Sequence, residues 1–187
     1  ERLLRRWRDG EARFPAYLCD HAQLSVACLD LYEATYDPVW FRKAVELSDK
    51  INRLFRNPDG PYYDTGTDGE VLLTRNAEGY DGVEPSGNSS LAHAFLRLRA
   101  YGVAPQYYED AQRIFRSFAP HLEQAGVSFS AMLGGLHFSL SAAKEVVVSG
   151  RRGEAETELL LDELRREYHP NIVVSFVENG ESPETEK

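Results

Sequence analysis

Five segments with helical periodicity fill most of the first 143 residues, and the size of their side chains alternates from one segment to the next. Apolar residues recur at helical spacing over about 20–35, 38–56, 86–101, 106–124 and 127–143. The first, third and fifth segments are rich in small residues, whereas the second and fourth carry large aromatic rings. Small side chains permit close approach in a crowded inner layer, and bulky ones pack from outside. The alternation predicts a mostly α fold, a partial (α/α) six-hairpin toroid of inner and outer helices.

The pattern changes after residue 143. Residues 145–149 and 171–177 indicate buried strands, and the amphipathic segment 154–168 between them indicates a helix. Strand, helix and strand with short connections form a βαβ unit, which requires parallel pairing. We therefore divide the chain into an α-hairpin half-toroid, residues 1–143, and a small C-terminal βαβ appendage with an acidic tail, residues 144–187.

Two shorter stretches carry patterns of their own. Residues 61–75 are rich in glycine, aspartate and tyrosine and end in an alternating segment, which predicts a long loop that holds a β-hairpin. The arginine-rich cluster at residues 2–8 is brief and amphipathic, which favours the solvated face of a helix. A chain that opens in mid-helix and without methionine indicates a fragment of a longer protein.

The charge balance limits the classes of partner. The 187 residues include 21 lysines and arginines against 30 aspartates and glutamates, for a net charge of −9. That balance argues against nucleic acid and against anionic membrane surfaces, and no apolar run approaches the ~20 residues of a membrane-spanning helix. Cys19 and Cys28 lie nine residues apart and fit neither a redox motif nor a disulfide scaffold. We interpret them as buried thiols and expect a cytoplasmic protein.

Residues 80–89, Tyr-Asp-Gly-Val-Glu-Pro-Ser-Gly-Asn-Ser, are the stretch most suggestive of a site. Pro85 cannot lie inside a helix and Ser86 is a favoured N-cap, so a helix begins here. Asp81 and Glu84 are therefore held beside the positive end of a helix dipole, where ligands often bind.

In a toroid all inner helices start at one rim, so the starts of the first and third helices meet. The rim would then hold eight polar or aromatic residues: Arg13, Asp20, His21, Tyr80, Asp81, Glu84, Ser86 and Asn88. We predict that Asp81 and Glu84 accept hydroxyl hydrogens or act as acid and base, and that His21 carries protons. The other five would contact or border the ligand. Purely structural roles stay open, because Asp20 and Ser86 also suit helix caps and Asp81-Gly82 suits a turn.

Metal and cofactor chemistry lack a sequence signal. His21, His93 and His137 lie at different depths along the predicted inner helices, and no His-x-x-x-His pair occurs. The run Ser149-Gly-Arg-Arg-Gly153 lacks the glycine spacing of a phosphate-binding loop and favours a tight turn. We therefore predict no metal and no cofactor.

Six segments carry a resemblance to a known family: Asp9-Gly10, Phe14–Leu18, Asp30–Ala34, Tyr62–Thr65, Tyr80–Ser89 and His169–Val174. They resemble the thioredoxin-domain-containing, spermatogenesis-associated proteins, in which a thioredoxin-like domain precedes a toroid similar to N-acylglucosamine 2-epimerases. The run Leu18-Cys19-Asp20-His21 departs from the family's pattern by one acidic residue.

The resemblance implies the C-terminal part of such a protein, with a central funnel that binds a small carbohydrate and a chemistry related to epimerisation or glycoside cleavage. The missing N-terminal portion of the same protein would be a partner. The alternative is a non-catalytic docking or structural platform attached to a thioredoxin-like domain. An incomplete toroid would expose inner-helix surface, so we also expect a possible homo-oligomer.

Overall fold

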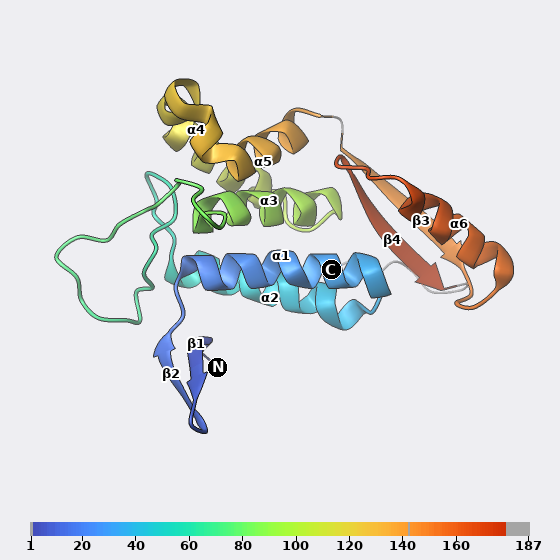
Figure 1. The fold of residues 1–187 in the computed structure, drawn as a ribbon, viewed down its shortest axis with the longest axis horizontal. Coiled ribbons are helices and arrows are strands. Elements are labelled where there is room, and N and C mark those ends of the chain that lie inside the picture. The colour runs from blue at the N-terminus through green and yellow to red at the C-terminus, as the bar shows by residue number, and fades with distance from the viewer. Residues whose placement is uncertain (1, 142, 179–187) are drawn as a thin grey trace.

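The computed structural model describes residues 2–141 and 143–178. The chain is mostly helical, as predicted, with two small pairs of strands (Figure 1). The elements are β1 (Leu4–Arg8), β2 (Glu11–Pro15), α1 (Leu18–Thr35), α2 (Pro38–Leu54), α3 (Gly87–Ala100), α4 (Gln106–Ala125), the 3-10 helix η1 (Gly126–Phe129), α5 (Ser130–Leu140), β3 (Lys144–Gly150), α6 (Ala155–Arg166) and β4 (Ile172–Glu178).

Helix α3 forms the centre of the molecule. It packs against α1 on one side and against α4 and α5 on the other, while α2 packs mainly on α1 (Figure 1). Most residues of α3 are buried. Aromatic rings fill the space between the helices: the ring of Phe95 stacks on Tyr107 at 4.8 Å between centroids, and Tyr101 meets Tyr32 and Phe41 edge-on.

The starts of α1 and α3 lie against each other. A Cβ atom added at Gly87 would come within 2.9 Å of the backbone nitrogen of Cys19 and of Cγ of Leu18. A glycine is therefore needed where the first turn of α3 crosses the first turn of α1. This close approach fixes the rim at which the candidate site is built.

The C-terminal βαβ unit has the parallel pairing that the sequence predicts. Strands β3 and β4 pair in parallel over their full lengths, and α6 covers one side of them. β4 alternates between buried and partly exposed residues, but β3 is mostly exposed, so the prediction of two buried strands is wrong for β3. On one face of this sheet, α6 and the end of α1 cover the strands, and the ring of Tyr36 meets Phe176 at 5.6 Å. On the other face, Val173 of β4 is buried in the core that the helices form.

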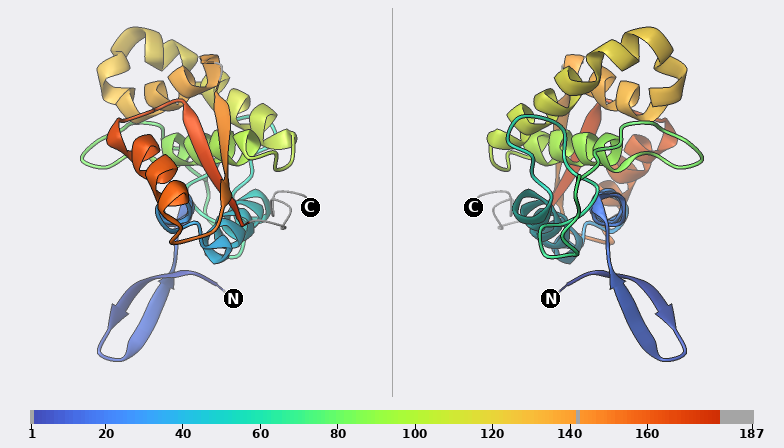
Figure 2. Two further views of the ribbon diagram at one scale, coloured as in Figure 1. Left: turned by 90° about the vertical axis from the view of Figure 1, so that its right-hand side faces the viewer. Right: turned by 90° about the vertical axis from the view of Figure 1, so that its left-hand side faces the viewer.

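The N-terminal prediction is also wrong. Residues 2–8 are not a helix face, because β1 and β2 form an antiparallel hairpin that projects from the body (Figures 1 and 2). The turn is Asp9-Gly10, with φ of +51° and +80°, as the two-residue turns of hairpins require. An aspartate followed by glycine reverses the chain before a helix can form.

Two further boundaries differ from the predictions. The expected hairpin within residues 61–75 does not form, since the alternating segment has no second strand to pair with and Val71 and Leu73 are fully exposed. The fifth helix is shorter than 127–143, because a 3-10 turn occupies Gly126–Phe129 and α5 ends at Leu140. The predicted acidic tail, residues 179–187, lies outside the described residues.

Candidate functional site

A pocket of about 460 Å³ lies where the first turns of α1 and α3 meet the long loop between α2 and α3. We call it the rim pocket. Its lining is Tyr17, Cys19, Asp64, Glu78, Tyr80, Gly82, Val83, Glu84, Pro85, Ser86 and Gly87. Three of the eight predicted site residues, Tyr80, Glu84 and Ser86, are therefore brought together here.

Asp81 lies behind the wall of the rim pocket and joins three parts of the chain. Its Oδ1 accepts a hydrogen bond from the backbone N–H of Ser86 at 2.8 Å, and its Oδ2 accepts from those of Ala131 (2.9 Å) and Met132 (3.1 Å). Its own N–H donates to the carbonyl of Ser128. The carboxylate thus holds the start of α5 against the start of α3. The geometry gives Asp81 a structural role and leaves it out of the pocket lining, while its catalytic role stays a prediction.

The side chain of Asn88 likewise binds backbone groups of other segments. Its Oδ1 accepts from the backbone N–H of Tyr62, and its Nδ2 donates to the carbonyls of Tyr62 and Glu78, each at 2.9 Å. The side chain is fully buried and does not line the pocket. Ser86 acts as the N-cap of α3, with its Oγ accepting from the N–H of Ser89 at 3.1 Å. These two residues position the loop rather than present groups to a ligand.

Asp20 and Arg13 lie outside the pocket. The Oδ2 of Asp20 accepts from the backbone N–H of Tyr17 at 2.7 Å, so this carboxylate closes the first turn of α1. Arg13 belongs to β2, where it is exposed and donates to Glu11 in its own hairpin. The prediction that Arg13 borders the rim is wrong, because the chain turns away into the projecting hairpin before α1 begins.

His21 is fully buried and lines no part of the rim pocket. Its Nδ1 lies 2.8 Å from the carbonyl of Tyr17, and its Nε2 has no hydrogen-bond partner among the described residues. Burial lowers the pKa of His21, and the positive charges of Arg2 and Lys50 lower it further. A neutral, enclosed imidazole cannot exchange protons with a ligand in the pocket, so the predicted proton carrier is misplaced.

Glu84 and Tyr80 are the predicted residues that do face open space. Glu84 is exposed, and its negative charge contributes to the raised pKa of the Cys19 thiol, which lines the same pocket. The Tyr80 ring is 56% exposed and rests edge-on against Phe129, with 6.5 Å between the ring centroids. Tyr17 adds a second exposed ring. Two aromatic surfaces therefore border an opening that carries a carboxylate.

Asp64 and Glu78 are site residues that the sequence prediction missed. Asp64 is half-buried, and its Oδ1 accepts from the backbone N–H of Glu78 at 3.2 Å. Burial raises the pKa of Asp64; the hydrogen bond from Glu78 opposes this rise and the charge of Glu78 adds to it. A carboxyl group with a raised pKa is better suited to donate and accept protons near neutral pH. The tyrosine- and aspartate-rich segment 62–65 was the available signal.

The Cys19 thiol is unsuited to nucleophilic chemistry. Burial raises its pKa, and the negative charge of Asp20 raises it further. Because the thiolate is the reactive form, a raised pKa leaves the group protonated and inert. Cys19 is half-buried and Cys28 is buried, and both are free thiols.

The described residues contain neither a metal-binding cluster nor a membrane-spanning helix. In residues 2–141 and 143–178, no cluster of three or more histidine, cysteine or acidic side chains is placed to hold a metal ion. Within the same residues, no helix combines the length and the apolar character needed to cross a membrane.

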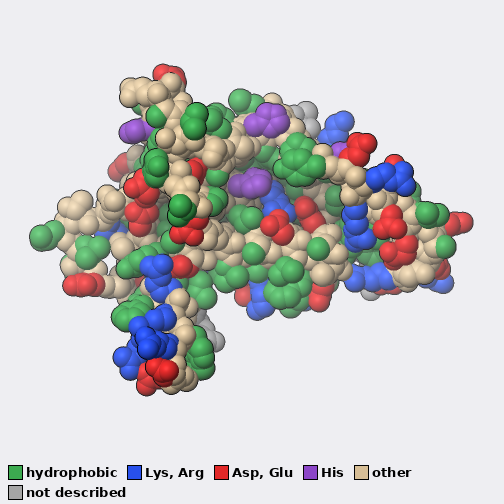
Figure 3. Space-filling view, in the orientation of Figure 1, with side chains coloured by type: hydrophobic (Ala, Val, Ile, Leu, Met, Phe, Trp, Pro, Cys, Tyr) green, Lys and Arg blue, Asp and Glu red, His purple; other side chains and the backbone are tan. Residues whose placement is uncertain are grey.

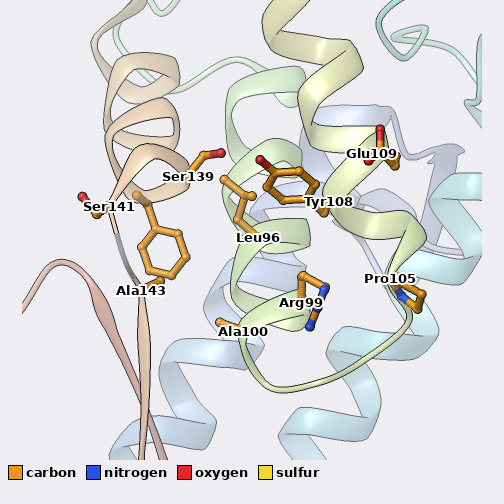
Figure 4. A pocket seen from close by; sticks show the side chains of 10 residues that line it. Leu96, Arg99, Ala100, Pro105, Tyr108, Glu109, Ser139, Ser141 and Ala143 are labelled. Carbon is orange, nitrogen blue, oxygen red and sulfur yellow. The ribbon is translucent and has the colours of Figure 1, made fainter.

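A second cavity, of about 530 Å³, lies at the other end of α3, between the start of α4 and the end of α5 (Figure 4). Its polar groups come from Arg99, Tyr108, Glu109, Ser139 and Ser141. Arg99 is in the last turn of α3, where a cation is favoured by the helix dipole, and Ser139 already accepts a hydrogen bond from Gln112. None of the predicted site residues lies here. The rim pocket is therefore the stronger candidate.

Comparison with known proteins gives the chain relatives. It is homologous to spermatogenesis-associated protein 20 of Homo sapiens, with 28% identity over 168 residues, and of Mus musculus, with 29% identity over 171 residues. Each match covers 89% of this chain and 21% of the relative. An uncharacterised protein of Caenorhabditis elegans is 28% identical over 177 residues, or 92% of this chain and 24% of that protein. No protein-family model matches the chain.

The chain thus spans about a fifth of the length of the curated mammalian relatives it matches. The homology confirms the spermatogenesis-associated part of the resemblance drawn from the sequence.

Proposed function

We propose that the rim pocket binds a small carbohydrate or sugar derivative. The observation that carries this proposal is the combination of two exposed tyrosine rings, Tyr17 and Tyr80, with the carboxylates of Asp64, Glu78 and Glu84 around one pocket. Sugar sites need a few polar groups that fix hydroxyls and an aromatic face on which the ring can stack. A volume of about 460 Å³ is in the range of small-ligand pockets.

Asp64 is the group best suited to proton transfer in this pocket. Its pKa is raised by burial, and the oxygen that does not accept from Glu78 is free to meet a ligand hydroxyl. Glu84 is exposed and supplies a second carboxylate. Two carboxyl groups in different environments are the arrangement from which acid and base roles arise. Epimerisation or glycoside cleavage at this pocket would therefore use Asp64 and Glu84 rather than Asp81 and His21.

The surrounding helices would form part of a six-hairpin toroid. Helices α1, α3 and α5 would be its inner helices, and α2 and α4 its outer ones; their packing order supports this, because α3 contacts both α1 and α5. The chain covers a fifth of the mammalian relatives, so the remaining hairpins and a thioredoxin-like domain would belong to the rest of a longer protein. Within that protein the rim pocket would open into the central funnel.

The proposal is tested by titrating the chain with a panel of monosaccharides and disaccharides, with chemical-shift changes of backbone amides as the readout. All eleven lining residues belong to this chain, so binding can be measured on it directly. We expect saturable shifts at Gly82 and Gly87 with at least one sugar. Asp64→Asn and Glu84→Gln should each weaken that binding about tenfold, which corresponds to the loss of a charged hydrogen bond.

Glu109→Gln, in the cavity at the other end of α3, is the matched control and should leave sugar affinity unchanged. If no sugar in the panel shifts the pocket amides of the folded chain, the carbohydrate proposal is wrong. The docking platform would then be the better proposal. It is favoured by one observation, the exposed apolar surface of the β1–β2 hairpin.

A further inference from the structure

The β1–β2 hairpin leaves its apolar side chains uncovered. Every residue of both strands is exposed, including Trp7 at 73% and Phe14 at 55%. Two strands alone are marginally stable in water. A hairpin that projects from the body with a tryptophan in solvent therefore indicates a surface that another molecule covers.

A groove of about 760 Å³ separates this hairpin from α1 and α2. We call it the hairpin groove. Trp7 lies on one wall, and Leu24, Trp40 and Leu47 lie on the other. The groove is thus lined by apolar side chains and is large enough to accept aliphatic side chains of another molecule.

The polar lining of the hairpin groove is positive, although the chain as a whole carries a net charge of −9. Four of its lining residues are cations and one is an anion: Arg2, Arg6, Lys43, Lys50 and Glu46. Figure 3 shows the arginines of the hairpin gathered at one corner of the molecule. A fitting occupant therefore combines aliphatic side chains with negative charge.

Helix α6 presents such a surface. Its buried side, with Thr157 and Leu161, faces the strands of the βαβ unit. A neighbouring stripe, which we call the leucine face, consists of Glu156, Leu159, Leu160 and Glu163. All four are exposed, with Leu159 at 69% and Leu160 at 57%. The spacing i, i+3, i+4 and i+7 places them on one side of the helix.

The hairpin groove and the leucine face lie at opposite ends of the molecule. The hairpin projects near the start of α1, whereas the βαβ unit is attached at the far end of that helix (Figure 1). One chain cannot bring its own two surfaces together. A second copy can, because the charge and the apolar pattern of each surface complement the other.

We propose that the leucine face of one chain docks into the hairpin groove of a second copy. Leu159 and Leu160 of one chain enter between Trp7 and Trp40 of the other. Glu156 and Glu163 then approach the cations of the hairpin groove, such as Lys43. The contact joins two different surfaces, so each added chain leaves one free groove and one free leucine face. Such head-to-tail contacts close into rings or continue as filaments.

Analytical ultracentrifugation of the chain tests this contact. The weight-average mass should exceed the 21.1 kDa of one chain and rise with concentration. The double variant Trp7→Ala/Lys43→Glu removes the groove, and Leu159→Glu/Leu160→Glu removes the leucine face. Both pairs are exposed in the single chain, so folding should be unaffected, and each variant alone should sediment as a monomer.

Mixing the two variants is the decisive measurement. Each keeps the surface that the other has lost, so an equimolar mixture should form a complex of two chains and nothing larger. Leu73→Glu, a fully exposed loop position away from both surfaces, is the control and should associate like the unaltered chain. A monomeric unaltered chain at all concentrations, a mixture that stays monomeric, or a variant that still self-associates would each overturn the proposal.

Discussion

The polar residues at the rim fall into two groups that differ in what their side-chain atoms bind. The side-chain oxygens of Asp81 and Asn88 accept hydrogen bonds from backbone N–H groups, both nearby in the sequence and in other segments, at 2.8 to 3.1 Å. Asp64 and Glu84 line the pocket. Within the described residues, one carboxylate oxygen of Asp64 and both of Glu84 accept no backbone hydrogen bond. We call the first group the fasteners and the second the open carboxylates.

The difference teaches how a rim of this kind is built. Helix starts carry unpaired N–H groups, and a loop that crosses several of them needs buried acceptors. Polar residues nearest the helix start are therefore used for assembly. The carboxylates that are available to a ligand, those of Asp64 and Glu84, lie on the loop between α2 and α3.

Among the tests of this comparison, Asn88→Ala should have the largest effect on stability. The change would leave the N–H and carbonyl of Tyr62 and the carbonyl of Glu78 without their partner in a buried place. Unsatisfied buried groups cost about 1–3 kcal/mol each, so we expect the free energy of unfolding to fall by about 4 kcal/mol. Urea denaturation measures it. Asn76→Ala, an exposed amide of the same loop, should change stability by less than about 0.5 kcal/mol.

The folded chain should lose stability in acid, because α3 carries a buried histidine, His93. Burial, with the charge of Arg97 adding to it, lowers the pKa of His93 to about 4. The folded pKa lies below the ordinary 6.5, so the unfolded chain binds the proton more readily. This stability is fully present above pH 6.5 and is lost as the pH falls towards 4, by about 3 kcal/mol.

Thermal unfolding between pH 7 and pH 4 checks this sign. His93→Gln removes the titrating group, so its stability should vary less over that range than that of the unaltered chain. An equal loss in both proteins would show that another group is responsible.

The sequence was a good guide to the helices and a poor guide to the roles of the rim residues. Helical periodicity located all five helices of the first part, and strand–helix–strand order gave the parallel βαβ unit. The N-terminal hairpin was missed even though Asp9-Gly10 is a strong hairpin signal, because the arginine cluster beside it also suits a helix face. Local pattern could not decide between them.

Tertiary packing explains why some predicted site residues lie outside the pocket lining. His21 looks like a proton carrier in the sequence, yet it is enclosed beside Phe55, with ring centroids 5.1 Å apart. Asp81 and Glu84 look equivalent three residues apart, and only the position of α5, fifty residues later, decides that Asp81 is consumed by backbone contacts. Asp64 was overlooked because its partner Glu78 is fourteen residues away. Such contacts depend on tertiary packing.

One substitution should act with opposite signs at the two kinds of carboxylate. Asp81→Asn replaces an acceptor of three N–H groups by an amide that can accept with one oxygen only, so stability should fall by about 2 kcal/mol. Asp64→Asn removes a charge that burial disfavours and keeps an oxygen for the N–H of Glu78. Its unfolding midpoint at pH 7 should rise slightly. If the unfolding midpoints of both variants fall, the distinction between fasteners and open carboxylates is wrong.

The smallest change in stability is expected for a substitution of Glu84, and a small change is the informative result. Glu84 is exposed and has no hydrogen bond or ion pair within the described residues, so Glu84→Gln should change the free energy of unfolding by less than about 0.5 kcal/mol. Urea denaturation beside Asp81→Asn makes the comparison within one loop. A loss as large as that of Asp81→Asn would mean that Glu84 also holds the rim together. A neutral result leaves its carboxylate with no structural task, as the ligand-binding role proposed for Glu84 requires.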